Sequence, residues 1–220
     1  MHYKAIIFDL DGTLLDTLED LAAAGNRVLA DQGLPTHPLE AYRFFVGDGL
    51  AMLIRRILPA EMRSEERMRA LADAFRKVYA AGWNVRTHPY EGVAELLDGL
   101  QERDVTMNVL SNKPHDFTEV CVREFFGGRP FAHVLGNREG VPRKPDPGGA
   151  LAIAAALRLD PGEIVYLGDT ATDMRTANAA GMFAVGALWG FRDVTELEES
   201  GAAMLAARPE EVLSLFESAR

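Results

Sequence analysis

An apolar run followed by closely spaced acids stands near the start of the chain: KAIIFDLDGTLLD, residues 4–16. Residues 4–9 carry β-branched and aromatic side chains and are bounded by Gly12, which predicts a buried strand. Beyond Thr17 the rhythm changes, and apolar side chains recur at helical spacing as far as residue 84. From residue 85 onward, further strand and helix patterns alternate. The predicted strands there are 105–110, 132–135, 164–167 and 183–187.

Strands that alternate with helices predict an α/β fold, a Rossmann-like parallel sheet with helices on both faces. The helical stretch 17–84 interrupts this alternation after the first strand. We therefore predict an α/β core made of residues 1–16 and 85–220, with residues 17–84 inserted as a helical cap. The hinges of the cap are expected near 14–17 and 83–89. Residues 190–207 favour a loop with at most one short helix.

Composition excludes several classes of protein. The chain has 220 residues, 48% of them hydrophobic, and a formal net charge of −10. Such a charge argues against nucleic-acid binding, which depends on clustered Lys and Arg. The single cysteine, Cys121, excludes an internal disulfide and is expected to be a buried thiol. The lack of disulfides favours a reducing, cytoplasmic location. We expect no membrane span and no signal peptide.

Polar side chains follow successive predicted strands. In an open parallel sheet the carboxyl ends of the strands lie along one edge, where ligands bind. We therefore expect these side chains to meet at that edge. They are Asp9, Asp11 and Thr13 after the first strand, Ser111, Asn112 and Lys113 after the second, Lys144 in the loop after the third, and Asp169 and Asp173 after the fourth.

The number of acids in this group predicts a cation. Two like charges about 4 Å apart repel by about 4 kcal/mol at an effective dielectric of about 20, so four carboxylates and a phosphate could not share one site alone. Mg²⁺ prefers carboxylate and phosphate oxygens. We expect Mg²⁺ and Lys144 to create a local positive site in an acidic protein, suited to a small phosphorylated metabolite.

The spacing of Asp9 and Asp11 suits covalent catalysis. A carboxylate can attack phosphorus and form an acyl-phosphate, provided that a second group protonates the leaving oxygen and later deprotonates water. Residues two apart on a strand face the same side, which suits Asp9 as nucleophile and Asp11 as acid and base. Gly12 permits a sharp turn after the pair. The polar groups of Thr13, Ser111 and Asn112 are expected to contact the phosphate.

These residues resemble the motifs of the haloacid dehalogenase-like superfamily. DLDGTLLD at 9–16 is similar to its first motif, Ser111-Asn112 to its second, Lys144 to its third and GDTATD at 168–173 to its fourth. The resemblance implies an aspartyl-phosphate on Asp9. It also implies Mg²⁺ held by Asp9, the Asp11 backbone carbonyl and Asp169, with Asp173 supporting the metal's waters or Lys144.

The helical insert and Asn112-Lys113-Pro114 make the chain similar to the phosphoglycolate phosphatases of that superfamily. The resemblance implies a phosphomonoesterase, with phosphoglycolate as the favoured substrate. In the insert, Gly47 and Gly49 open a predicted helix whose N–H groups could select an anionic substrate. Arg43 and Arg55 are candidate partners for a substrate carboxylate. The oligomeric state is not predicted.

Other functions share part of this pattern. A phosphosugar mutase would use every core motif and differ in returning the phosphoryl group to the sugar. A phosphorylation-switch receiver module also combines acids, Mg²⁺ and a lysine, but it carries its phosphorylated Asp on a later strand and has no helical insert. A calcium loop starting at Asp9 would need glycine where Leu14 stands.

Overall fold

A parallel sheet forms the centre of the protein. The computed structural model describes residues 3–216. Six strands pair side by side in the order β5-β4-β1-β6-β7-β8, each parallel to its neighbours. Their bounds, in that order, are Phe131–Asn137, Thr106–Pro114, Ala5–Phe8, Ile164–Gly168, Phe183–Ala187 and Met204–Ala206. The predicted α/β fold is confirmed.

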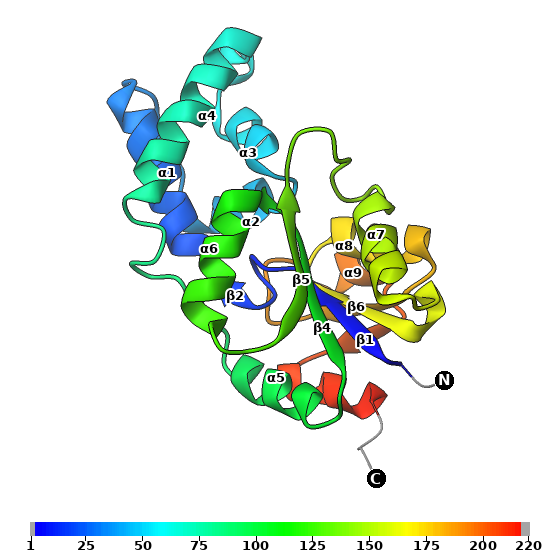
Figure 1. Cartoon of the computed structure of the whole chain (residues 1–220). Helices are drawn as coiled ribbons and strands as arrows, with labels where there is room; N and C mark the ends of the chain where they lie inside the picture. The colour runs from blue at the N-terminus through cyan, green and yellow to red at the C-terminus, as the bar shows by residue number, and fades with distance from the viewer. Residues whose placement is uncertain (1–2, 217–220) are drawn as a thin grey trace.

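Alternate side chains of β1 pack on opposite faces of the sheet, as the two-residue period of a strand requires. Ile6 and Phe8 belong to the hydrophobic cluster on one face, and Ala5 and Ile7 to the cluster on the other. Helices α5 (Val93–Gln101) and α6 (His115–Phe126) cover the first face. The second face carries α7 (Gly148–Leu157), α8 (Ala171–Ala180) and α9 (Val194–Glu199). Figure 1 shows both layers.

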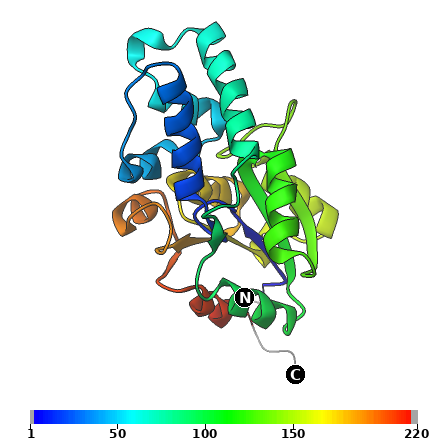
Figure 2. The same cartoon turned by 90° about the vertical axis from the view of Figure 1, so that its left-hand side faces the viewer.

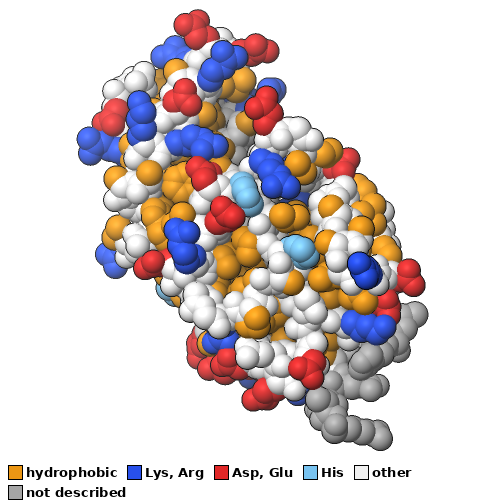
Figure 3. All heavy atoms as spheres, in the orientation of Figure 1, with side chains coloured by type: hydrophobic (Ala, Val, Ile, Leu, Met, Phe, Trp, Pro, Cys, Tyr) orange, Lys and Arg blue, Asp and Glu red, His pale blue; other side chains and the backbone are white. Residues whose placement is uncertain are grey.

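A separate group of helices stands at the carboxyl ends of the strands (Figures 1 and 2). This helical block consists of α1 (Leu18–Asp31), α2 (Leu39–Phe45), α3 (Leu50–Ile57) and α4 (Glu65–Ala80). The block has a hydrophobic cluster of its own. Acidic and basic side chains are interspersed over the face of it seen in Figure 3. Within residues 3–216, no helix combines the length and the apolar character needed to cross a membrane.

A short ribbon joins the two segments that connect the sheet to the helical block. Strand β2 (Leu15–Asp16) pairs antiparallel with β3 (His88–Pro89). The ribbon lies in the segments that the sequence suggests as hinges, although the pairing itself was not predicted. Each strand has only two residues, so neither carries a readable period.

The buried carboxylate of Asp20 holds the second connection against the first turn of α1. It accepts hydrogen bonds from the backbone N–H groups of Arg86 and Thr87, at 3.0 and 2.8 Å, and from the Thr87 hydroxyl at 2.8 Å. Asp20 is only 4% exposed, so these donors have no ready replacement in water. The chain that enters the helical block and the chain that leaves it are therefore fixed to each other.

Two sequence-based predictions need correction, and the structure adds a C-terminal helix to the elements named above. Strand β4 runs on to Pro114 because it pairs with Asn137 of β5 beyond a register shift, so Ser111, Asn112 and Lys113 lie within the strand and do not follow it. Residues 190–207 contain strand β8 as well as helix α9. The C-terminal helix is a 3-10 helix, Pro209–Leu215. Shorter 3-10 turns occupy Ala60–Met62 and Pro161–Glu163.

We expect replacement of Asp20 by Ala to lower the free energy of unfolding by about 2 kcal/mol, because buried N–H groups lose a charged acceptor. Urea unfolding measures the change. Asp31→Ala is the matched control, since Asp31 lies on the same helix and pairs with Arg27 at the exposed surface. Its cost should stay below about 0.5 kcal/mol. Equal losses in both variants would contradict a special role for Asp20.

Candidate active site

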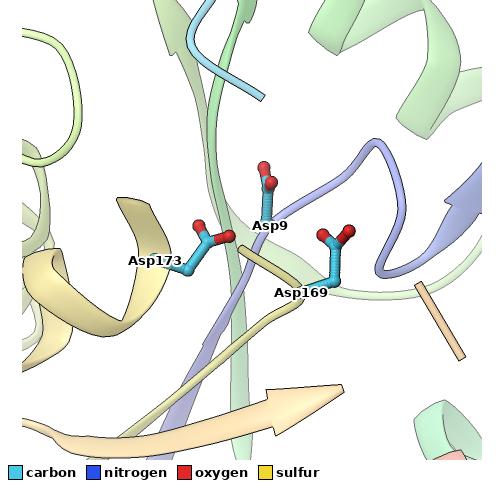
Figure 4. A group of neighbouring side chains, drawn as sticks. All are labelled: Asp9, Asp169 and Asp173. Atoms are coloured by element: carbon cyan, nitrogen blue, oxygen red, sulfur yellow. The ribbon is translucent and has the colours of Figure 1, made fainter. Parts of the chain in front are cut away.

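Carboxylates from neighbouring strand ends converge on one buried point. Asp9 follows β1, Asp169 follows β6, and Asp173 lies in the first turn of α8. Each offers an oxygen, and these three oxygens lie within 4.8 Å of one another. Figure 4 shows the carboxylates gathered around one space. The sheet order explains the meeting, because β1 and β6 are adjacent and their following loops leave the same edge.

Glycines allow the loops to come this close. Gly12 has φ +89°, and a Cβ at this position would lie 2.3 Å from Asp169 Oδ2. A Cβ on Gly190, in the loop after β7, would lie 2.3 Å from Asp169 Cβ. Neither distance is possible between non-bonded atoms. The expected turn at Gly12 is confirmed, and the same glycine gives Asp169 the room that it occupies.

Lys144 neutralises part of this charge. Its Nζ lies 2.9 Å from Asp9 Oδ1 and 2.7 Å from Asp173 Oδ1, and its side chain is 2% exposed. Burial alone would lower the pKa of Lys144, but Asp173 and Asp9 raise that pKa well above the ordinary value. The ammonium group therefore stays charged between the two acids.

Asn112 positions the Lys144 loop. Its side-chain oxygen accepts from the Lys144 backbone N–H at 3.0 Å, and its amide nitrogen donates to the carbonyls of Lys144 at 3.1 Å and Gly47 at 3.2 Å. The amide thus has protein partners on both atoms. This differs from the expected contact with phosphate, and it makes Asn112 a link between the sheet, the Lys144 loop and the helical block.

The two hydroxyls expected at the phosphate have different surroundings. Thr13 is fully buried and donates to Asp169 Oδ1 at 3.0 Å, so its hydroxyl faces the acid and not the cavity described below. The turn at Gly12 directs it there. Ser111 lines the cavity, and its oxygen accepts from the Lys113 N–H at 3.2 Å. The hydroxyl hydrogen of Ser111 remains available to a bound anion.

The buried acids outnumber the positive charges beside them, as the ligands of a cation site do. Burial raises the pKa of Asp9 to about 7 against the opposing effect of Lys144. Burial, Asp173 and Asp9 together raise the pKa of Asp169 to about 8. Among residues 3–216, no group donates a hydrogen bond to the buried Oδ1 of Asp9, because Lys144 approaches it without hydrogen-bond geometry. Crowded oxygen ligands with an unsatisfied oxygen fit a hard divalent ion such as Mg²⁺.

Asp11 has a different partner from the other acids. Its carboxylate accepts from Lys113 Nζ at 2.9 and 3.2 Å, and the same ammonium lies 2.8 Å from the Tyr79 hydroxyl of α4. Burial alone would lower the pKa of Lys113, but Asp11 and Tyr79 raise it above the ordinary value. The sequence analysis named Lys113 as a polar residue near a strand end and as part of Asn112-Lys113-Pro114, and its pairing with Asp11 was not predicted.

A cavity opens beside the acids, between the strand ends and the helical block. Asp9, Asp11 and Ser111 line its sheet side, and Gly47 and Gly49 line its block side. Most of the remaining wall is apolar, formed by residues such as Leu21, Leu50, Leu53, Phe75 and Phe117. Asp9 and Asp11 therefore both face this cavity.

The arginine at this cavity is Arg76, which the sequence did not single out. It lies on α4 and meets Asp116 at 3.4 Å with 45% of its side chain exposed. The sequence named Arg43 and Arg55 as candidates for this role. Arg43 donates instead to the carbonyls of Phe191 and Gly190, at 3.1 and 2.6 Å, and Arg55 is exposed and is not among the residues that line the cavity. Arg43 therefore joins α2 to the loop after β7. The orientation of a whole helix decides which arginine faces the cavity, and a local sequence pattern does not predict that orientation.

Comparison with known proteins gives consistent matches. A family model for haloacid dehalogenase-like hydrolases matches residues 6–187. A phosphoglycolate phosphatase of Pseudomonas syringae pv. tomato is 34% identical over 206 residues, which are 92% of this chain and 75% of the relative. A phosphoglycolate phosphatase of Thiobacillus denitrificans is 32% identical, with 89% of this chain and 88% of the relative covered. The span matched by the family model includes the acids of the site, Asp9, Asp11, Asp169 and Asp173, as well as Lys144.

A solved structure agrees along almost the whole length. The crystal structure of a predicted phosphoglycolate phosphatase from Haemophilus somnus 129PT has a TM-score of 0.91 to this chain at 25% identity. The superposition covers 98% of each chain. The similarity therefore extends over the helical block as well as the sheet.

We expect magnesium at about 100 times its Kd to stabilise the protein by about 2.7 kcal/mol, because an ion that binds only the folded state shifts the unfolding equilibrium. For a chain of this size that is a rise in Tm of about 5 °C or more. Thermal unfolding in magnesium and in EDTA measures it. Asp169→Asn should abolish the rise, and Glu102→Gln, at an exposed position, should keep it. A full rise in Asp169→Asn would contradict the assignment.

Proposed function

Since the chain belongs to the haloacid dehalogenase-like hydrolases and is a phosphoric monoester hydrolase, we propose that it works through a phosphoryl group carried on Asp9. The observation that carries this proposal is the position of Asp9. It is a buried carboxylate at the cavity wall, with Lys144 at 2.9 Å and a second acid, Asp11, beside it in the same cavity. A nucleophile and an acid that face one space are what a two-step transfer needs.

In the first step, a carboxylate oxygen of Asp9 attacks phosphorus and the bond from phosphorus to the leaving oxygen breaks. Asp11 gives its proton to that oxygen, so the leaving group departs as a neutral alcohol. In the second step, Asp11 takes a proton from water, the water oxygen attacks phosphorus, and the bond between phosphorus and Asp9 breaks. Inorganic phosphate leaves, and both acids return to their starting states.

Lys144 and Ser111 stabilise the charge on the transferring group. Lys144 orients Asp9 and offsets the negative charge that gathers during attack. The Ser111 hydroxyl, on the sheet side of the cavity with Asp9, can donate to a phosphoryl oxygen. Asn112 acts indirectly, because it holds the Lys144 loop through both backbone groups of Lys144.

Mg²⁺ is the cation that we assign to the acidic group. Asp9 and Asp169 would hold it, with the Asp11 backbone carbonyl and Asp173 as further oxygen ligands or as partners of its waters. When bound, it neutralises charge on the phosphate and orients the substrate. The support for this assignment is the gathering of three buried carboxylates, whose oxygens lie within 4.8 Å of one another. Burial first, and the neighbouring acids second, raise the pKa values of Asp9 and Asp169.

The helical block, residues 17–84, is proposed to act as a cap over the core formed by residues 1–16 and 85–220. Its separate hydrophobic cluster and the paired connections at β2 and β3 support this division. Closure of a cap excludes water during attack on Asp9 and opening admits it for the second step. Its inner wall is then the part of the site that selects the leaving group.

Phosphoglycolate is the substrate that the names of the relatives suggest, and it is the one that we propose. Its carboxylate needs a positive or N–H-bearing partner away from the phosphate. Arg76 supplies such a charge at the cavity, since its contact with Asp116 is long and exposed. Gly47 and Gly49, which precede α3, bring backbone close to the same space. A leaving group of two carbons also fits walls that are mostly apolar.

Asp9→Asn should lower kcat for p-nitrophenyl phosphate by roughly 10³-fold or more, because the amide cannot form the acyl-phosphate. Acid-quenched reactions with labelled substrate should leave phosphate bound to the parent protein and none bound to the variant. The substitution removes one of several crowded charges, so we expect no fall in Tm. A variant that hydrolyses the ester at the parent rate would overturn the mechanism.

Arg76→Ala should raise KM for phosphoglycolate by about tenfold while leaving KM for p-nitrophenyl phosphate within about twofold, because one charged contact contributes about 1.4 kcal/mol or more. Arg55→Ala is the matched control, since Arg55 is an exposed arginine of the same helical block. It should change neither KM. Unchanged KM values in Arg76→Ala would remove this arginine from substrate selection.

A further inference from the structure

A chain of polar contacts runs from the helical block to Asp11. It starts at the Tyr79 hydroxyl on α4, which lies 2.8 Å from Lys113 Nζ. The same Nζ donates to Asp11 Oδ1 at 2.9 Å and to Oδ2 at 3.2 Å. Lys113 stands near the end of β4, so a residue of the block reaches the acid through a residue of the sheet. The two-step transfer described above uses Asp11 but gives no role to Tyr79 or Lys113.

Burial makes these contacts specific. The Lys113 side chain is 3% exposed and that of Asp11 is 11% exposed. An ion pair taken out of water seldom adds stability over an apolar pair, because desolvation opposes the attraction. It does fix where each charge lies, since Lys113 is almost closed to solvent and Asp11 is exposed only toward the cavity. The arrangement therefore favours a role in placing Asp11 over a role in stability alone.

The ring of Tyr79 is itself held in place. It stacks on Phe75 with ring centroids 5.6 Å apart, and meets Phe117 of α6 edge to face at 5.1 Å. The Lys113 ammonium also lies 4.7 Å from the centre of the Tyr79 ring. Phe75 and Phe117 line the cavity, so the packing that forms the cavity wall also sets the position of the Tyr79 hydroxyl.

We propose that Tyr79 is a positioning residue for the acid–base step, acting through Lys113 to hold Asp11 where it can reach the leaving oxygen. Its hydroxyl can contact Lys113 only while α4 lies against the end of β4. Asp11 is therefore held in place when the cavity wall is complete. This inference rests on the proposed role of Asp11, and it assigns to Tyr79 no contact with the substrate.

The chemistry provides a selective test. Asp11 gives a proton to the leaving oxygen as the bond to phosphorus breaks. An alkyl alcohol leaves poorly without that proton, whereas p-nitrophenolate leaves as a stable anion and needs it little. The ratio kcat/KM reports the steps up to departure of the leaving group and not the later attack of water. Misplacing Asp11 should therefore lower kcat/KM for alkyl phosphates and spare kcat/KM for p-nitrophenyl phosphate. A general loss of folding or of cap closure would harm both.

The experiment compares kcat/KM for glycerol 2-phosphate, an alkyl phosphate, with kcat/KM for p-nitrophenyl phosphate. Both are measured in magnesium for the full chain and its variants. Tyr79→Phe keeps the ring and removes the hydroxyl. We expect kcat/KM to fall about tenfold with glycerol phosphate, a part of the 10²–10⁴-fold effect of general acid catalysis, and less than about twofold with p-nitrophenyl phosphate. Equal falls with both esters, or no fall with either, would overturn the proposal.

Tyr42→Phe is the matched control. Tyr42 is a fully buried tyrosine of α2 in the same helical block, and its hydroxyl donates to Asn26 Oδ1 at 3.0 Å. It makes no contact with the chain of groups described here. Any effect of this substitution should be equal for the two esters. A leaving-group-dependent loss in Tyr42→Phe as large as in Tyr79→Phe would count against the proposal.

Two further variants separate this inference from the mechanism on which it rests. Lys113→Gln should show the same dependence on the leaving group as Tyr79→Phe and a larger loss, and it provides the test if Tyr79→Phe does not fold. Asp11→Asn should show the largest dependence. If Asp11→Asn shows it and the other two variants do not, the inference fails and the proposed function stands. If Asp11→Asn shows none, the role of Asp11 fails first.

Discussion

Mutual repulsion between buried carboxylates is the constraint around which the site is organised. Oxygens of Asp9, Asp169 and Asp173 lie within 4.8 Å of one another, and each such pair would repel by about 4 kcal/mol at 4 Å and an effective dielectric of about 20. Lys144 contacts two of these acids and so offsets only part of the repulsion. The remaining excess of negative charge is what would attract the proposed cation, and through it a phosphate, to a protein whose net charge is −10.

The surrounding structure keeps the acids close in spite of that repulsion. The pairing of β1 with β6 fixes the positions of the strand ends that Asp9 and Asp169 follow. Asp169 packs so close to Gly12 and Gly190 that neither position has room for a side chain. Thr13 and the Phe191 N–H each donate to Asp169, at 3.0 and 2.9 Å. Since the interior is close-packed, the acids cannot move apart without disturbing the end of the sheet.

Those parts of the site that follow from the periodicity of the sequence could be predicted. Asp9, Asp169 and Lys144 could be brought together in advance because each follows a strand, and parallel strands end at one edge. Arg76 and Tyr79 could not, because they lie on α4 and their contacts depend on the tilt of that helix over the sheet. The partners of Thr13 and Asn112 depend on loop conformation in the same way. Strand β8 was not predicted because Met204–Ala206 is too short to show the two-residue period of a strand.

The ribbon formed by β2 and β3 limits how the helical block can rotate. Its strands are hydrogen-bonded to each other, with Leu15 opposite Pro89 and Asp16 opposite His88, so any rotation must bend both connections together about one axis. Two separate flexible connections would allow the helical block many orientations relative to the sheet. The block would then lose orientational entropy each time it moved onto the sheet. A single axis removes most of this loss in advance. In the proposed mechanism, the block would then return to the same register over Asp9 in every catalytic cycle.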